Sequence, residues 1–286
     1  MPTPASGTIT IYDINKEFAL GNDIAVYRGV RWYTPASLET GLFSTTNLSF
    51  ADFYNKQAKD PAQPSPTGGV PYVTPGTYDF IVPLFRTSLT VKLWGGGGGG
   101  GGYGNYPGSS YSSGVVYGAN GADTIFAAPV KLIAGGGKGG QNAGRDRYGG
   151  LASGAGGAGG TAVGGDVNTP GFAGGNGYTG YNNCHGGGSP NGGADTPNNA
   201  AGINGYGYPG NAPGGGGGGV IGDRGAKFWA NSGGAGGGGY VQKTYTTAEL
   251  VSGTIIKITI GAGGLGNKYN GSGGDGANGK ILITWS

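Results

Sequence analysis

The sequence predicts a mostly β and irregular protein, in which a small N-terminal module precedes a larger glycine-rich domain. Three observations support this fold class: 73 of the 286 residues are glycine, the glycines are gathered in runs, and short alternating apolar segments lie on either side of those runs. Charged residues and aromatic residues each make up 11% of the chain. Disordered chains are usually rich in charge and poor in aromatic rings, so this composition favours packing. Glycine does not recur at every third position throughout, which excludes a collagen-like triple helix.

Residues 1–60 have an ordinary composition and are expected to form a separate module. A strand is predicted at 8–11, and short helices at 13–20 and 49–56. The second helix would carry an apolar face. Because so short a segment buries little surface, we expect this face to dock on another chain or on the next domain rather than to make a core of its own. The residues proposed for attachment are Trp32, Phe50, Phe53 and Tyr54, for which a role in a local core is an equally good interpretation.

The segment 61–70 is rich in Pro, Ser and Gly and is predicted to be a linker. Residues 71–286 would then form the glycine-rich domain, with strands at about 72–94 and 254–286. In these strands apolar residues alternate with polar ones, as half-buried strands require. The strands are expected to pair into one small β-sandwich or sheet, with 95–241 inserted between its halves as a glycine bundle and loops.

The glycine runs are expected to be ordered as extended helices with three residues per turn. Such polyglycine II helices have no internal hydrogen bonds, so their amides can pair with neighbouring helices when no Cβ keeps the backbones apart. This packing predicts that other residues recur at every third position, on an outward face. Ala155, Ala158 and Thr161 keep that spacing. The residues that break it are Leu151, Ser153, Ala277 and Lys138. The alternative is a set of flexible glycine linkers.

Between the glycine runs lie segments rich in Tyr, Asn and Pro, a composition typical of recognition loops. Aromatic rings supply rigid contact area at a low entropic cost. The alternative is that about half of these rings cover the sides of the bundle. The candidate binding residues are Tyr106, Tyr111, Tyr148, Phe172, Tyr178, Tyr181, Tyr206, Tyr208, Phe228 and Trp229.

The sequence offers little for catalysis, metal binding or nucleic acid binding. Cys184 and His185 are the only cysteine and histidine, so a disulfide, a zinc site and a nucleophilic triad are all disfavoured. The net charge of +3 comes from scattered residues and gives no basic patch for nucleic acid. We therefore expect no enzyme, no cofactor and no metal. The start of the chain lacks the features of a secretory signal, and no apolar stretch is long enough to span a bilayer.

The succession of Trp94, the glycines 95–102 and then alternating glycine motifs and variable loops resembles the glycine-rich adhesins at the tips of T-even-like phage long tail fibres. The resemblance covers about 90–286. It implies a sandwich of polyglycine helices whose distal loops bind a bacterial outer-membrane protein or surface glycan. It also implies a protein made in the host cytoplasm without a signal peptide and carried on the virion, in its tail or tail fibre.

The N-terminal module departs from those adhesins. Its segments 11–17 and 48–54 resemble short modules that open various phage structural proteins. That resemblance implies attachment to another tail or fibre protein.

Two other functions remain open from the sequence. The protein could be a structural or decoration protein of the virion, which would show no affinity for host cells. An ice-binding or wall protein is the more distant alternative, because it requires a flat repetitive face with few loops, and the long tyrosine-rich insertions disfavour it.

Overall fold

The computed structural model describes residues 3, 6–33, 40–58, 68–83, 85, 87–102, 117–145, 151–177, 184–196, 206–220, 231–268 and 272–286. The chain divides into two compact units, Met1–Pro66 and Thr67–Ser286, and the division falls inside the segment 61–70 that the sequence predicts as a linker. Two antiparallel five-stranded sheets dominate the second unit, and helices are few. The prediction of a mostly β and irregular protein is confirmed.

The first unit contains the α-helix α1 (Ile11–Phe18), the 3₁₀ helices η1 (Ile24–Tyr27) and η2 (Phe50–Phe53), and a two-stranded sheet of β1 (Arg31–Tyr33) and β2 (Thr40–Leu42). Helix α1 begins earlier than predicted because Thr10 is its N-cap. The Asp13 carboxylate accepts a hydrogen bond from the Thr10 backbone N–H at 2.9 Å and another from the Thr10 hydroxyl at 2.6 Å. These bonds from Thr10 are the main reason that the pKa of Asp13 lies below its usual range.

The first unit has a hydrophobic core of its own, so the expectation that it would lack one is wrong. Phe53 is fully buried, and its ring lies 4.3 Å from that of Phe43, 5.5 Å from that of Tyr27 and 6.0 Å from that of Phe18. Large rings bury much area per residue, which allows a short chain to close a core. The buried cluster consists of Ile9, Ile14, Phe18, Tyr27, Phe43 and Phe53.

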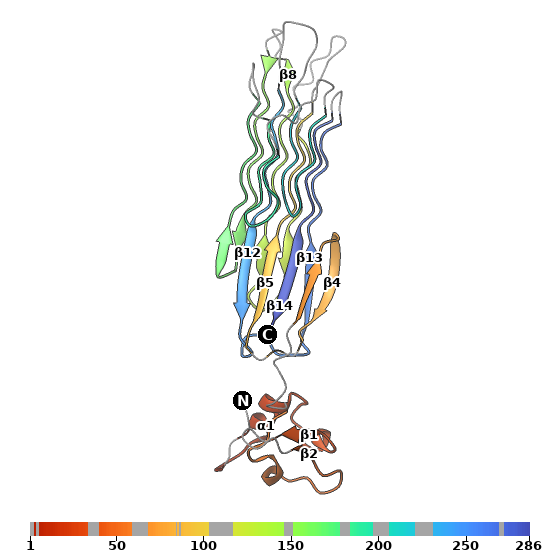
Figure 1. The fold of residues 1–286 in the computed structure, drawn as a ribbon, viewed down its shortest axis with the longest axis vertical. Helices are drawn as coiled ribbons and strands as arrows, with labels where there is room; N and C mark the ends of the chain where they lie inside the picture. The colour runs from red at the N-terminus through yellow and green to blue at the C-terminus, as the bar shows by residue number, and fades with distance from the viewer. Residues whose placement is uncertain are drawn as a thin grey trace. The chain divides into compact units, whose positions relative to one another are not determined.

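The second unit is built on two sheets, visible in the lower part of that unit in Figure 1. One sheet has the strand order β10 (Ala162–Val163), β7 (Leu132–Ala134), β6 (Thr124–Phe126), β13 (Ile255–Ile260) and β4 (Gly76–Ile81). The other has the order β11 (Val167–Thr169), β12 (Tyr240–Tyr245), β5 (Leu89–Trp94), β14 (Lys280–Trp285) and β3 (Gly68–Tyr72). A separate short pair joins β8 (Gly144–Arg145) and β9 (Leu151–Ala152).

Three of the long strands agree with the sequence prediction, whereas the six-residue β12 and the short strands were missed. Strands β5, β13 and β14 lie within the predicted segments. Strand β3 begins inside the predicted linker, while β6, β7, β10, β11 and the first two residues of β12 lie inside the predicted insertion 95–241. Strands of two or three residues are too short for an alternating pattern to identify.

Both sheets contribute to one hydrophobic core. In β5 the side chains of Leu89, Val91 and Leu93 are fully buried, and in β13 those of Ile256, Ile258 and Ile260 are at most 2% exposed. The two sets belong to a single cluster that also includes side chains of β6, β7, β12 and β14. The alternation read from the sequence therefore marks the buried face of each of these strands.

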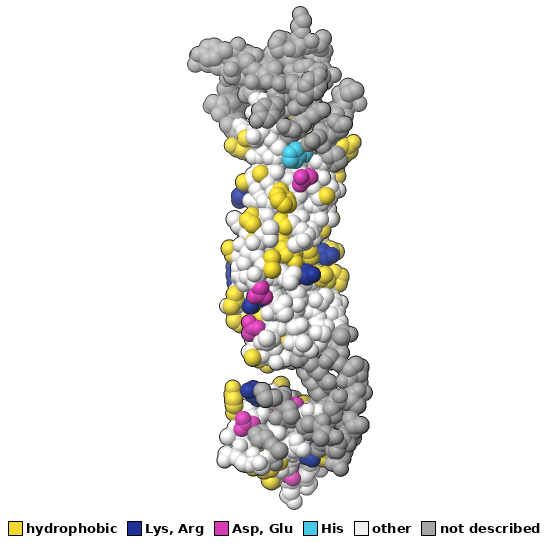
Figure 2. Space-filling model, turned by 60° about the vertical axis from the view of Figure 1, so that its left-hand side comes forward, with side chains coloured by type: hydrophobic (Ala, Val, Ile, Leu, Met, Phe, Trp, Pro, Cys, Tyr) yellow, Lys and Arg dark blue, Asp and Glu magenta, His cyan; other side chains and the backbone are white. Residues whose placement is uncertain are grey.

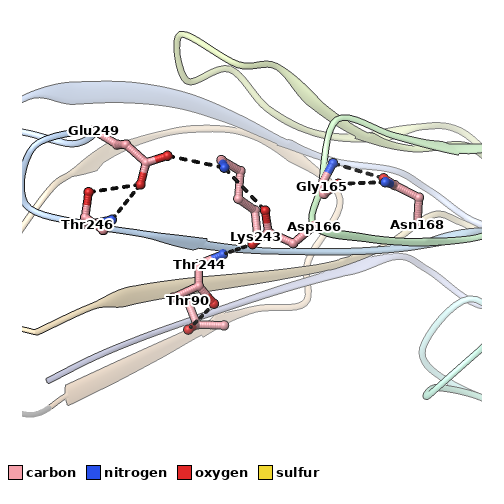
Figure 3. Close-up of polar contacts among 8 residues, drawn as sticks. All are labelled: Thr90, Gly165, Asp166, Asn168, Lys243, Thr244, Thr246 and Glu249. Atoms are coloured by element: carbon pink, nitrogen blue, oxygen red, sulfur yellow. Dashed lines mark hydrogen bonds and ion pairs between the residues drawn. The ribbon is translucent and has the colours of Figure 1, made fainter.

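Consecutive strands lie in different sheets at both lateral edges of this unit, since β3 precedes β4 and β10 precedes β11. The second crossing turns at Gly164, whose φ of +91° favours glycine. Figure 3 shows the ion pairs that stabilise this crossing. Lys243 Nζ lies 3.5 Å from Asp166 Oδ1 and 3.4 Å from Glu249 Oε1. The Asp166 carboxylate also accepts the Thr244 N–H at 2.8 Å. The pKa of Glu249 is lowered first by the Thr246 backbone N–H, then by the Thr246 hydroxyl and by Lys243.

We predict that Phe53→Ala unfolds the first unit and leaves the second intact. Truncating a buried phenylalanine costs about 3–5 kcal/mol, a large share of the stability of so small a unit. Amide hydrogen exchange followed by mass spectrometry is expected to show lost protection across 6–58 and unchanged protection across β5, β13 and β14. The matched control is Phe50→Ala in the same 3₁₀ helix, because Phe50 is 41% exposed. Equal loss of protection in both variants would contradict the assignment of Phe53 to the core.

Candidate functional site

The glycine segment 95–102 follows β5 directly and donates its amides in a three-residue cycle. The N–H groups of Gly95, Gly98 and Gly101 donate to the segment 233–239, with N···O distances of 2.9–3.0 Å. Those of residues 96 and 99 donate to Ala122 and Ala119, and those of residues 97 and 100 donate to Ala277 and Gly274. Successive amides thus point to three different neighbours before the cycle repeats.

The carbonyl groups of the same segment accept in a similar cycle from three further neighbours. Residues 96, 99 and 102 accept from the segment 137–143, residues 97 and 100 accept from Gly264 and Asn267, and residue 98 accepts from Gly217. Segment 95–102 is therefore enclosed by hydrogen-bonded chain on all sides, with nearly every donor and acceptor paired inside the protein.

This enclosure explains why eight consecutive residues are glycine. A Cβ placed on any residue from Gly95 to Gly101 would lie 2.0–2.3 Å from a backbone oxygen of a neighbouring segment. No real Cβ approaches an oxygen so closely, and a backbone oxygen in a hydrogen-bonded array has no room to move. Two other segments, 214–219 and 233–239, are buried throughout, and the second contains one non-glycine residue, the fully buried Ala235.

The outer segment 154–161 follows the every-third-residue rule that the sequence predicts. In the segment 154–161, Ala155, Ala158 and Thr161 are exposed. A Cβ on the glycines between them would lie 1.8–2.1 Å from backbone oxygen. Lys138, an exception to the rule when counted from Ala134, is exposed and stands three residues before Gln141. Its spacing from Ala134 carries no meaning, because Ala134 belongs to the buried face of β7.

Polar side chains at the same spacing pair with amides that no neighbouring backbone reaches. Asn120 and Asp123 accept the N–H groups of Gly139 and Gly136 at 3.0 and 2.9 Å. In the same way, Asp275 and Asn278 accept those of Gly266 and Gly263 at 2.8 and 3.0 Å. The Asn and Asp residues of the outer segments thus complete the hydrogen bonding of the array, a role that sequence reasoning missed although their spacing of three signals it.

The ends of several glycine segments meet at the end of the array opposite the two sheets, as Figure 1 shows. There Gly102 N–H donates to Asn142, the Ser232 hydroxyl donates to Gly101, and Tyr117 pairs with Gln141. Similar contacts at this end join Gly177 to Gly154, Ser232 to Val220, Gly273 to Asn267 and Tyr206 to Ser272. The described chain therefore reaches this one end many times, and the residues placed there include 102 and 117, 177, 220 and 231, and 272.

The candidate binding residues divide into two sets. Phe172, Tyr206 and Tyr208 are described, with 58%, 68% and 51% of their surface exposed. The remaining candidates lie outside the described residues: Tyr106, Tyr111, Tyr148, Tyr178, Tyr181, Phe228 and Trp229.

Tyr206 and Tyr208 lie in one segment of the array, and Phe172 lies in another. Tyr206 lies beside Ser272 at the far end, and the Tyr208 carbonyl accepts the Gly218 N–H at 2.9 Å. Phe172 lies close to the sheets, where its carbonyl accepts the Gly237 N–H at 2.9 Å. Within the described hydrogen-bond network, the buried segments 214–219 and 233–239 intervene between them. Phe172 therefore belongs to a different surface.

The proposed attachment residues of the first unit have unequal exposure. Phe53 is fully buried and takes the core role that the sequence left open, so its side chain is closed to a partner. Trp32 and Tyr54 are half-buried against the same core, and Lys56 Nζ lies 3.5 Å from the centroid of the Trp32 ring. The Tyr54 hydroxyl donates to the Gly7 carbonyl. Phe50 is the member of this set with an exposed side chain.

The single cysteine and histidine of the chain lie within the described residues. Cys184 and His185 serve the array through their backbones, because their carbonyls accept the N–H groups of Gly219 and Gly175. Burial in the sheet core, followed by the charges of Glu249 and Asp166, raises the pKa of Tyr245 well above its usual range. No group of three potential metal ligands occurs among the described residues. On the face shown in Figure 2, charged side chains are scattered rather than gathered in a patch.

Comparison of the chain with models of known protein families, with curated proteins and with solved structures gives no match. No helix in the described ranges is long and apolar enough to cross a membrane. The functional argument therefore rests on the geometry of the residues themselves.

We predict that Gly98→Ala destabilises the second unit by about 3 kcal/mol or more, because its Cβ would lie 2.3 Å from the Lys138 carbonyl oxygen. The gain from a less flexible unfolded chain is only about 0.4–1 kcal/mol and does not offset this clash. Urea unfolding monitored by circular dichroism measures the change. The control is Ala158→Ser, which adds one atom at an exposed position of an outer segment and is expected to change stability by less than about 0.5 kcal/mol. Similar midpoints for the two variants would refute the close packing of the interior.

Proposed function

We propose that this protein is a bacteriophage tail adhesin that binds a receptor on the bacterial surface through loops at the far end of its glycine array. The observation that carries the proposal is the convergence of chain ends: separate glycine segments repeatedly lead to one end, and the connections there are, by sequence, rich in Tyr and Asn. Recognition surfaces favour this composition, since tyrosine gives rigid contact area and asparagine gives adaptable hydrogen bonds.

The proposed architecture is a bundle of polyglycine II helices carried on a β-sandwich. Its support is the three-residue cycle of donors and acceptors, together with outward residues at every third position in the outer segments. The sandwich is supported by the single core that both sheets share.

Such a bundle suits a receptor-binding protein because its hydrogen bonds join backbone to backbone. The identities of the loop residues therefore place little constraint on the scaffold, and loops can vary while the scaffold stays the same. The exposed rings of Tyr206 and Tyr208 lie on the part of the array nearest to the proposed receptor. An outer-membrane protein or a surface glycan fits a surface of aromatic and amide groups with few charges.

We assign virion attachment to the first unit, with another tail or fibre protein as its partner. It is a compact unit with its own core, joined to the array-bearing unit at Pro66–Thr67. The exposed Phe50 is the leading contact residue. Trp32 and Tyr54, which are half-buried against the core of this unit, are the further candidates. The virion is the corresponding location.

Binding of the fluorescently labelled full chain to a panel of bacterial strains tests the proposal. We expect labelling of some strains and not others, because receptors differ among strains. The double variant Tyr206→Ala, Tyr208→Ala is expected to weaken binding about tenfold or more, as the loss of central aromatic contacts usually does. A second variant, Tyr178→Ala, Tyr181→Ala, Trp229→Ala, tests the candidates outside the described residues.

The matched control is Phe172→Ala, which removes a ring of similar exposure near the sheets and is expected to leave binding unchanged. If Phe172→Ala weakens binding as much as the double variant, the far end is not the binding surface. If no strain is labelled, including one that the parent virus infects, the protein is a structural or decoration component of the virion.

A further inference from the structure

A groove of about 470 Å³ opens on the side of the second unit, where β14 meets the glycine array. Its walls include Val73, Pro213 and Ala277, and its polar residues are Asn278 and Lys280. This volume lies within the range of small-molecule sites. The groove is separate from the far end, because Lys280 is the first residue of β14 and pairs with Trp94 at the end of β5.

Lys280 is the cation of this groove, and no described carboxylate forms an ion pair with it. It is half-buried, and its Nζ lies 5.6 Å from the centroid of the Trp94 ring, which holds the side chain against the protein. The described ion pairs involve Lys243 and Lys257, and none involves Lys280. A lysine ammonium with no carboxylate partner in the described ranges favours an anionic ligand.

Asn278 supplies a second donor two residues away. Its Oδ1 accepts the Gly263 N–H at 3.0 Å, which fixes the orientation of the side-chain amide. Its Nδ2 has no hydrogen-bond acceptor in the described part of the chain, so two N–H donors remain for a ligand. The groove therefore offers an oriented amide beside a cation.

The rest of the groove is apolar and small. Val73 is 57% exposed, and the Pro213 ring and the Ala277 methyl group complete the apolar lining. Ala277 breaks the every-third-residue rule of the outer segments. Its position in the groove explains the exception, because the hollow leaves room for a methyl group that a neighbouring segment would otherwise exclude.

We propose that this groove binds an acidic saccharide, a pyranose that carries one carboxylate. The single ammonium of Lys280 matches a carboxylate, whereas a phosphate would bring about −1.5 to −2 charges and call for a second cation. The Asn278 amide donates to a ring hydroxyl or to the carboxylate. The apolar lining packs against the C–H face of the sugar ring. This site does not involve the aromatic residues at the far end. An experiment that rejects one of the two sites therefore leaves the other untouched.

Two-dimensional NMR of the ¹⁵N-labelled full chain, titrated with methyl β-D-glucuronide and with methyl β-D-glucoside, tests the proposal. The glucuronide is expected to shift the amide signals of 276–280 with a dissociation constant on the order of 1 mM, as its small size implies. The neutral glucoside is expected to bind about tenfold more weakly or worse. Lys280→Met keeps the apolar stem of the side chain. This variant is expected to bind the glucuronide as weakly as it binds the glucoside.

Two further variants separate charge from folding. Val73→Glu places a carboxylate at an exposed groove residue without touching the glycine array, and it is expected to abolish glucuronide binding at an unchanged melting temperature. Lys131→Met, which removes an exposed lysine elsewhere, is expected to have no effect. Equal binding of the two glycosides, or full binding by Lys280→Met, would overturn the site. If sodium acetate or an acidic peptide shifts the same signals as strongly as the glucuronide, the ligand is a carboxylate of another class and the saccharide assignment is wrong.

Discussion

The pairing of backbone amides across side-chain-free segments is the interaction on which the second unit depends. Each such bond contributes only about 0.5–1.5 kcal/mol net, while fixing one residue costs about 1–2 kcal/mol, so hydrogen bonds alone leave the array near balance. The apolar core between the sheets supplies the remaining stability. Because Trp94 runs directly into Gly95, and Ile260 into Gly261, the core also fixes the starting positions from which the glycine segments extend.

The sequence predicts this architecture best where a residue's identity is forced by one steric condition. The residues 95–101 must be glycine because every side is occupied, and in the outer segment 154–161 glycine is required at two positions in three. Strands β5, β13 and β14 are predictable for a similar reason, since one face of each is buried. The core of the first unit was harder to predict. It depends on ring contacts between Phe18, Tyr27 and Phe53. These residues are distant in the sequence, and no local pattern indicates that they meet.

The positions of the candidate residues could be predicted from the sequence only in part. Composition alone indicates aromatic recognition segments, but only the lateral order of the glycine segments separates Phe172 from Tyr206 and Tyr208. That order is set by which amide meets which carbonyl, information that repeated glycines do not encode individually. The groove at Lys280 could not be predicted from the sequence either. It forms where β14 meets the array, from residues that are far apart in the sequence and come together only when the sheets form.

The three-residue cycle of segment 95–102 has a consequence for how such a chain can change length. Each residue turns the segment by about 120°. One inserted residue would therefore rotate every later amide of the segment toward the wrong neighbour. Within the array, only insertions in multiples of three keep the amides in phase, and even these displace the register with the adjoining segments. The number of residues can therefore change freely only in the connections outside the array. The geometry of the hydrogen bonds alone confines such insertions and deletions to the two ends of the array.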